Sequence, residues 1–132
     1  SAVVESLNGC ALRGWLAEER SRMDLAVEEF LRVVTRVQCS KPRHVRRDVE
    51  IDGVQLVKGD RVMAMLGAAN LDPAANACPH KLDLARKPNR HIAFGTGIHF
   101  CLVHQLARLA ATWALRALIE RWPDLQLSPT PI

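Results

Sequence analysis

The chain has 132 residues and a mass of 14.7 kDa, so we expect a single domain over residues 1–132 rather than two full domains. Apolar residues make up 48% of the chain, too many for a disordered protein, and no uncharged apolar run approaches the ~18 residues that cross a membrane. The net charge is +4, but aromatic residues amount to only 5% and tyrosine is absent, which disfavours nucleic-acid binding.

The four cysteines are widely spaced and include no C-x-x-C pair, a distribution unlike that of a disulfide scaffold or a zinc ribbon. No basic segment followed by an apolar one opens the sequence, so we expect no signal peptide. We therefore expect a cytoplasmic protein in a reducing environment, with no membrane contact.

Two helices are predicted in the N-terminal part of the sequence. Apolar residues at helical spacing favour a helix over residues 3–16, although Gly9 and Gly14 lower its propensity. After a charged stretch, Asp24 is a suitable N-cap for a second helix that runs to about Thr35. We expect this helix to bury an apolar stripe made of Leu25, Phe30, Leu31 and Val34.

A β-hairpin is predicted around Asp52 and Gly53, because apolar and polar residues alternate on both sides of an Asp-Gly pair that favours a two-residue turn. The short apolar run over residues 61–66 is compatible with a buried strand or with a helical turn. Residues 71–90 are rich in proline, asparagine and charge, and they predict a long ordered loop of the kind that often carries function.

The strongest helical pattern covers residues 102–121 and ends before Pro123. Its apolar positions include Leu109 and Trp113, which we expect to lie in the core. Together these elements predict a mainly α fold with a small β-hairpin element.

The clearest chemical signal is the stretch FGTGIHFC, which ends at Cys101. Gly95 and Gly97 allow a sharp turn and let the backbone approach a flat ligand without a Cβ in the way. The cysteine lies at the start of the last predicted helix, where the helix dipole and free N–H groups favour an anionic sulfur. His99 can donate a hydrogen bond to a nearby anion, and Phe94 can shield the sulfur from water. A shielded sulfur with close backbone access suits a thiolate-ligated iron.

This stretch resembles the haem-binding loop of cytochromes P450, whose pattern is F-G-x-G-x-H/R-x-C-x-G. The resemblance implies that Cys101 is the axial ligand of the iron of haem b and that His99 contacts a haem propionate. It also implies that Phe94, Gly95 and Gly97 shape the cofactor-binding loop. The stretches GAANLDP and NRHIAFG are typical of bacterial members of the family.

Charged residues elsewhere add to the resemblance. Glu29 and Arg32 match the family's E-x-x-R, and their i, i+3 spacing on one helix face lets the side chains meet. Arg86 matches the third member of this structural cluster. Arg43 matches the family's propionate-binding arginine, although its basic surroundings are equally compatible with a solvated face.

The resemblance runs from about residue 24 to residue 127 and corresponds to the haem-proximal, C-terminal third of the P450 fold. It therefore implies a truncated fold without the distal helix that carries the family's acid–Thr pair. Val103 stands where the family has glycine. If the family's backbone is kept, we expect a positive φ there and a strain of about 1–3 kcal/mol.

The function implied by the resemblance is that of a haem-thiolate oxidoreductase, a monooxygenase or peroxygenase-like enzyme that acts on a small organic substrate. Two alternatives remain: a non-catalytic haem binder and a haem-free interaction or activator module. A truncated fold exposes apolar surface, so we expect a homo-oligomer or a second protein that completes the missing half. An acidic, ferredoxin-type redox partner would meet the basic cluster Lys81, Arg86, Lys87 and Arg90.

Several residues also have a simpler interpretation. Cys101 can be a buried structural thiol that behaves as a small apolar side chain. His91 is interpreted as a surface residue rather than a contact to the haem edge, and His104 is expected to face solvent. A zinc site built around Cys78 and His80 fits no common zinc-module spacing.

Overall fold

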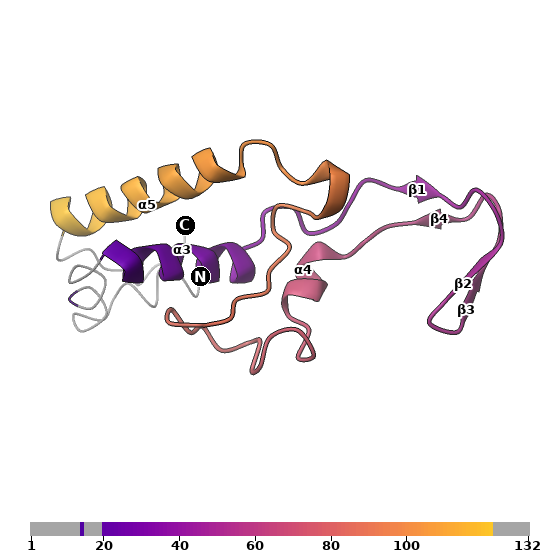
Figure 1. The fold of residues 1–132 in the computed structure, drawn as a ribbon, viewed down its shortest axis with the longest axis horizontal. Coiled ribbons are helices and arrows are strands. Elements are labelled where there is room, and N and C mark those ends of the chain that lie inside the picture. Colours follow the sequence, from indigo (N-terminus) through magenta and orange to yellow (C-terminus); the bar gives the residue numbers. More distant parts are fainter. Residues whose placement is uncertain (1–13, 15–19, 123–132) are drawn as a thin grey trace, which may run out of the picture.

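The computed structural model describes residue 14 and residues 20–122, so the helix predicted over residues 3–16 lies outside the described residues except at one position. The helices of this part are α3 (Arg20–Val33), α4 (Leu66–Asn70) and α5 (His104–Arg121), with a 3₁₀ turn, η1, at Gly97–His99. The strands are β1 (Arg43–His44), β2 (Val49–Ile51), β3 (Val54–Leu56) and β4 (Arg61–Val62). The fold is mainly helical with small β elements, as the sequence predicted (Figure 1).

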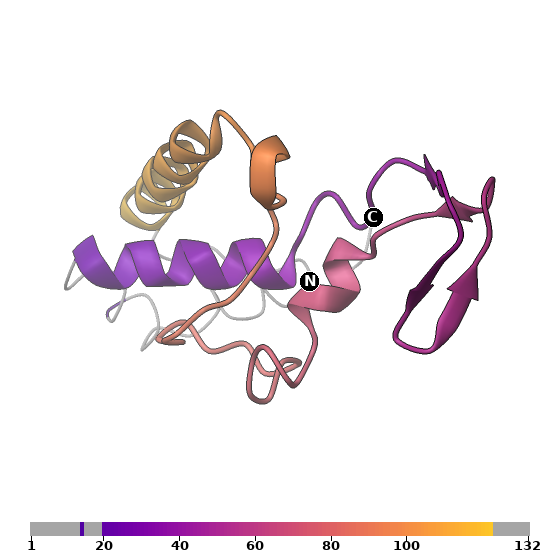
Figure 2. The ribbon, with the colours of Figure 1, turned by 45° about the vertical axis from the view of Figure 1, so that its right-hand side comes forward.

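Helix α3 lies at the centre of the helical part. Figures 1 and 2 show α5 along one side of α3 and the loop that follows α4 along the other side. The buried apolar side chains are Met23, Ala26, Val27 and Phe30 on α3, joined by Leu84 from the loop. Partly buried side chains from the second half of α5 pack against this core: Leu115, Leu118 and Ile119. The core therefore holds α3 between α5 and the loop.

Helix α3 differs from its prediction in its first residue and in the face that it buries. It begins at Arg20, so Asp24 lies inside the helix and is not its N-cap. Of the predicted apolar stripe, only Phe30 is buried. The fully buried face instead includes Glu29 and Arg32, which pair with each other, and Glu29 also pairs with Arg86 from a distant segment of the chain.

The predicted hairpin is confirmed. Strands β2 and β3 pair antiparallel, with Ile51 opposite Val54. Asp52 and Gly53 form the turn with φ values of 48° and 78°, the left-handed conformation that this two-residue turn requires. Because the apolar side chains of the hairpin are largely exposed, its register follows from the turn rather than from burial.

Residues 61–66 contain a short strand and the start of a helix, but the strand is not buried, unlike the buried strand that the sequence left open. Strand β4 pairs with β1, with Arg43 opposite Val62, and helix α4 begins a few residues later at Leu66. Residues 71–90 contain neither helix nor strand, and the predicted long loop is confirmed. None of the helices in the described residues is both long enough and apolar enough to cross a membrane.

Helix α5 begins two residues later than predicted and exposes side chains that we expected in the core. Leu109 is 50% exposed and Trp113 is 56% exposed, so the prediction for both residues is wrong within the described structure. Leu102 and Leu106 are also exposed; Leu102 lies just before the helix, and the spacing of Leu106, Leu109 and Trp113 places those three on one side of it. We call these residues the α5 face. It is an apolar surface that no described element covers.

Candidate functional site

A carboxylate and two arginines form a buried ionic cluster between α3 and the loop. Glu29 and Arg32 lie one turn apart on α3, and both side chains are completely buried. Arg32 donates from Nη2 and Nε to the two carboxylate oxygens of Glu29, each at 2.8 Å. Arg86, from the loop, donates from Nε to the same two oxygens at 3.1 and 3.0 Å. The structure thus brings these three sequence-predicted residues into direct contact.

The arginines use their remaining N–H groups on the backbone of the loop. Arg32 Nη1 donates to the carbonyl oxygens of Asn70 and Pro79 at 3.0 and 2.7 Å. Arg86 Nη1 donates to the carbonyl oxygen of Ala77 at 2.7 Å. A segment without helix or strand must satisfy its buried carbonyl groups in some other way, and here guanidinium groups do so.

The carboxylate of Glu29 is held in its charged form. The Asp83 N–H and Asn89 Nδ2 each donate to it at 3.0 Å, in addition to the two arginines. Burial acts to raise the pKa of Glu29, but the hydrogen bonds from Arg32, from the Asp83 N–H and from Arg86 outweigh burial and lower this pKa. The cluster is therefore ionised at neutral pH and fixes the loop on α3.

The FGTGIHFC stretch folds as a turn between the loop and α5. Gly95 and Gly97 have φ values of 76° and 69°, a backbone conformation that glycine adopts without strain. The Cys101 N–H donates to the carbonyl oxygen of Phe94 at 3.0 Å, which joins the two ends of the turn. The Cys101 carbonyl accepts a hydrogen bond from the His104 N–H at 3.3 Å, so the turn leads directly into α5.

Val103 is not strained, contrary to our expectation. Its φ is −97° and its ψ is 19°, and a negative φ is open to any L-residue. The side chain is exposed, so it does not displace a neighbour either. The replacement of the family's glycine therefore carries no backbone cost in this structure.

Cys101 is half-buried, and several of its neighbours in the sequence are apolar. Ile98 and Leu102 are 96% and 95% exposed, and Phe100 is also exposed. Such a dense group of open apolar side chains is unusual on a free surface and marks a site of ligand or protein contact.

The two residues that the resemblance assigned to haem propionates lie on separate elements. His99 ends η1 and Arg43 begins β1, and both are exposed. They come from segments on either side of α4 in the chain, so only the tertiary fold sets their separation.

Sequence reasoning missed a second ionic cluster, which is built on Glu28. Glu28 Oε1 accepts from Arg108 Nε at 2.5 Å, and Oε2 accepts from Arg108 Nη2 at 3.0 Å. His91 Nε2 contacts the same Oε2 at 2.8 Å. We call Glu28, His91 and Arg108 the Glu28 cluster. His91 stands three residues before the FG pair and Glu28 directly precedes the E-x-x-R, but no spacing in the sequence links the two.

Two histidines therefore lie differently from our prediction. His91, expected at the surface, has a side chain that is only 4% exposed. His104, expected to face solvent, is half-buried and accepts a hydrogen bond at Nδ1 from Arg108 Nη1 at 2.7 Å. His91 contacts the carboxylate of Glu28 on α3, and His104 contacts Arg108 one turn further along α5.

The carboxylate of Glu28 is strongly acidic. Burial acts to raise its pKa, but the hydrogen bonds from His91 and Arg108, together with the positive charge of Arg108, lower the pKa to about 2. Glu28 is thus a fixed negative charge between α3 and α5 at any physiological pH.

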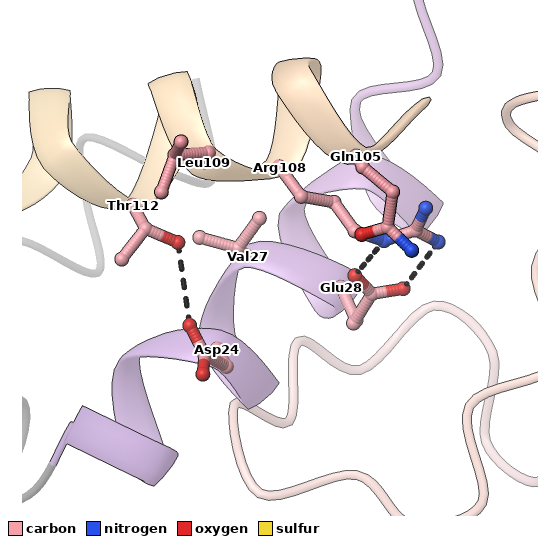
Figure 3. A pocket seen from close by; sticks show the side chains of 7 residues that line it. All are labelled: Asp24, Val27, Glu28, Gln105, Arg108, Leu109 and Thr112. Atoms are coloured by element: carbon pink, nitrogen blue, oxygen red, sulfur yellow. Dashed lines mark hydrogen bonds and ion pairs between the residues drawn. The ribbon is translucent and has the colours of Figure 1, made fainter. Parts of the chain in front are cut away.

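A cavity of about 350 Å³ lies between α3 and α5 beside this cluster. Figure 3 shows Glu28 and Asp24 projecting from α3 toward Arg108 and Thr112 of α5. Within residues 20–122, no group of three or more His, Cys, Asp and Glu side chains is arranged to hold a metal ion. The lining of the cavity is mixed: Arg108 and Thr112 are hydrogen-bonded to Glu28 and Asp24 across the two helices, whereas Val27 and Leu109 are apolar.

Comparison with known proteins assigns the family. The family profile of cytochrome P450 matches residues 18–128. The chain belongs to the cytochrome P450 family. The P450 monooxygenase PikC of Streptomyces venezuelae is 41% identical over 116 residues, which cover 88% of this chain and 28% of that protein. The family that the sequence pattern indicated is therefore confirmed.

Solved P450 structures share the fold. The structure of PksS, the bacillaene polyketide synthase P450 of Bacillus subtilis 168, aligns with a TM-score of 0.87 and 37% identity, over 98% of this chain and 33% of that one. CYP109E1 of Bacillus megaterium, solved in complex with testosterone, aligns with a TM-score of 0.84 and 38% identity, over 92% of this chain and 34% of that one. The chain thus corresponds to about a third of a P450, a family whose cofactor is haem b.

Proposed function

We propose that this chain forms the haem-thiolate part of a P450 oxidoreductase, with Cys101 as the axial ligand of the haem iron. The observation that carries the proposal is the half-buried Cys101 at the end of a glycine turn, among apolar side chains that are open to solvent. The reaction is that of a monooxygenase on a small organic substrate, in keeping with the family.

The residues around Cys101 fit a flat apolar macrocycle with anionic edges. Ile98, Phe100 and Leu102 offer exposed apolar surface on both sides of the thiol in the chain. A Cβ added at Gly97 would meet no atom within 4 Å, so the backbone there is open to the approach of a ligand. His99 and Arg43 are exposed donors available for the two carboxylate groups of haem.

Haem bound by a thiolate supplies the electron transfer and the cleavage of an O–O bond. The protein's task in this part of the fold is to hold the sulfur in place. The hydrogen bond from the Cys101 N–H to the Phe94 carbonyl fixes the cysteine backbone, and Gly95 and Gly97 make that short closure possible. We assign no acid–base role to any described side chain.

The α5 face and the open side of the turn need further polypeptide to enclose a substrate. The chain spans 28% to 34% of the length of the relatives named above. We infer that a second copy of the chain, or a second protein that carries the rest of a P450 fold, covers this surface.

An acidic ferredoxin-type protein is the redox partner that we propose. Lys81, Lys87 and Arg90 are exposed and line a cavity of about 480 Å³ on the loop. Arg86, the fourth residue of the predicted basic cluster, also lines this cavity, but it is buried and paired with Glu29, so it adds no free positive charge there. Three exposed cations against the one exposed carboxylate of Asp83 in the same lining still favour an acidic partner and make its association depend on salt.

A second candidate is a non-catalytic role, as a haem carrier or as a haem-free partner module. The extent of the exposed α5 face favours it, because such a surface is typical of a protein that associates with another. A haem-free module would not need Cys101, whereas an enzyme and a haem carrier would both need it.

The visible spectrum of the purified chain with added haem tests the proposal. We expect a ferrous–CO band at the position that names the family, and its loss in Cys101→Ala. Cys78→Ser, which removes an exposed thiol on the loop, is the matched control and should keep the band. A chain that stays colourless, or a spectrum that Cys101→Ala leaves unchanged, contradicts thiolate ligation. Turnover with peroxide then separates an enzyme from a carrier.

A further inference from the structure

Glu28 contacts both segments that flank the haem-thiolate turn. His91 precedes the turn and Arg108 follows it on α5, and both side chains reach the same carboxylate on α3. The distances are 2.8 Å from His91 Nε2 and 2.5 and 3.0 Å from Arg108 Nε and Nη2. One carboxylate therefore bridges α3, the segment before the turn and the helix after it.

The contact with His91 also orders the backbone that enters the turn. The Ala93 N–H donates to His91 Nδ1 at 3.2 Å, so the proton of the neutral ring lies on Nε2 and is donated to Glu28. The His91 side chain is only 4% exposed, so this contact is shielded from water.

The contact with Arg108 extends to the cysteine itself. The guanidinium group of Arg108 lies 4.8 Å from the ring centre of Phe94, whose carbonyl accepts the Cys101 N–H at 3.0 Å. Arg108 Nη1 also donates to His104 Nδ1, and the His104 N–H donates to the Cys101 carbonyl. Arg108 thus touches the residues that hold the backbone of Cys101 on both its N–H and its carbonyl side.

The bidentate pairing of Arg108 depends on the charge and the shape of Glu28. A carboxylate accepts two parallel N–H bonds from a guanidinium group, whereas an amide of the same shape presents one acceptor and two donors. Loss of the second acceptor leaves either Arg108 or His91 without its partner. Where Arg108 is the group that loses its partner, the ring of Phe94 loses the guanidinium group that lies over it.

We propose that Glu28 is a positioning residue for the haem-thiolate turn: through His91 and Arg108 its carboxylate holds Phe94 and the backbone of Cys101 in place. This inference rests on the proposed role of Cys101 as the haem ligand. Glu28 acts alongside the buried ionic cluster of Glu29, Arg32 and Arg86 but on a different part of the site, since Glu29 holds the loop before residue 90 and Glu28 holds the turn after it.

The test compares Glu28→Gln with the unaltered full chain by amide hydrogen exchange without haem. We expect the amides of Ala93 and Cys101 to exchange about ten-fold faster in the variant, while the Phe30 amide in the centre of α3 changes little. A merely structural role would speed all three amides together. Unchanged exchange at Ala93 and Cys101 would overturn the proposal.

The matched control is Glu120→Gln on α5. Glu120 forms an exposed i, i+4 pair with Arg116 at 3.3 Å, and its loss should alter neither loop exchange nor haem binding. If Glu120→Gln accelerates exchange at Cys101 as much as Glu28→Gln does, the effect is general and the proposal fails.

Haem retention separates the positioning role from the proposed function. In the haem-loaded chain, we expect Glu28→Gln to lose haem to an acceptor protein at least several-fold faster and to show a smaller thiolate ferrous–CO band. A variant that equals the unaltered chain in both readouts overturns the positioning role alone. If the unaltered chain itself gives no Cys101-dependent band, the proposed function fails and the role of Glu28 toward haem fails with it.

Discussion

Arg86 lies 57 positions after Glu29 in the chain, yet its Nε is within 3.1 Å of both carboxylate oxygens. This contact closes the long loop over α3, and the remaining N–H groups of Arg86 satisfy loop carbonyls at Ala77 and Lys81. The turn that carries Cys101 begins directly after this loop. The buried cluster therefore has a structural part in the site, because it holds on α3 the loop that precedes the turn.

Neutralising the buried carboxylate should be severe. In Glu29→Gln, the guanidinium groups of Arg32 and Arg86 stay buried without their counter-charge, and we expect a loss of about 3–5 kcal/mol in the free energy of unfolding. Denaturant unfolding measures it. Glu50→Gln, on the exposed hairpin, is the control and should stay within about 0.5 kcal/mol. Similar small losses in both variants would mean that the cluster does not support the fold.

Stability should fall as the pH drops below about 4.5. The pKa of Glu28 is about 2 in the folded chain against an ordinary value of 4.5, so folding favours its ionised form. That contribution is complete above the unfolded value and disappears as the pH falls through the folded one. For Glu28 it amounts to about 2–3 kcal/mol, allowing for its remaining contact with solvent. Acid titration of the unfolding free energy should show a shallower decline in Glu28→Gln, and equal declines would contradict the assigned charge.

The glycine turn should be sensitive to substitution of Gly97 and insensitive to substitution of the preceding Thr96. Gly97 has a φ of 69°, so Gly97→Ala should cost about 1–2 kcal/mol and weaken haem retention, although there is room for the Cβ. Thr96 is exposed and extended, with a φ of −154°, so Thr96→Ala is a neutral control in the same turn. Denaturant unfolding and haem loss check both, and an unaffected Gly97→Ala would show that the left-handed conformation is not needed.

Restoring the family's glycine should not stabilise this chain. Val103 has a negative φ, so Val103→Gly relieves no strain and adds freedom to the unfolded chain. We expect a loss of about 0.4–1 kcal/mol in the free energy of unfolding. Val103→Ala, which keeps a Cβ, serves for comparison and should change stability less. A gain in stability with glycine would mean that the valine is strained after all.

The α5 face should govern association rather than folding. Leu106 is exposed, so Leu106→Ser should leave the unfolding free energy almost unchanged while lowering self-association and the binding of an apolar dye. Leu118, which packs on the core, is the contrasting variant, and Leu118→Ser should destabilise the fold by about 1–3 kcal/mol. Sedimentation measurements report the association. A monomeric chain at all concentrations would argue against a homo-oligomer and favour a different protein as the cover.

Local patterns were sufficient where neighbours in the sequence are also neighbours in space. The Asp52–Gly53 turn, the start of a long helix after Cys101 and the Glu29–Arg32 pair all depend on interactions within a few residues. The FGTGIHFC stretch indicated its family for the same reason, since a ligand-binding turn is specified by consecutive residues.

The tertiary structure decided which faces are buried and which charges meet. The apolar pattern of α5 could not show that Trp113 stays exposed while Leu115 packs on α3, because periodicity identifies a face but not its partner. Nor could it show that His91 and Arg108 converge on Glu28, since contacts across 63 and 80 positions depend on how α3 and α5 pack. Short-range geometry follows from the sequence directly, whereas long-range pairing exists only once the chain has folded.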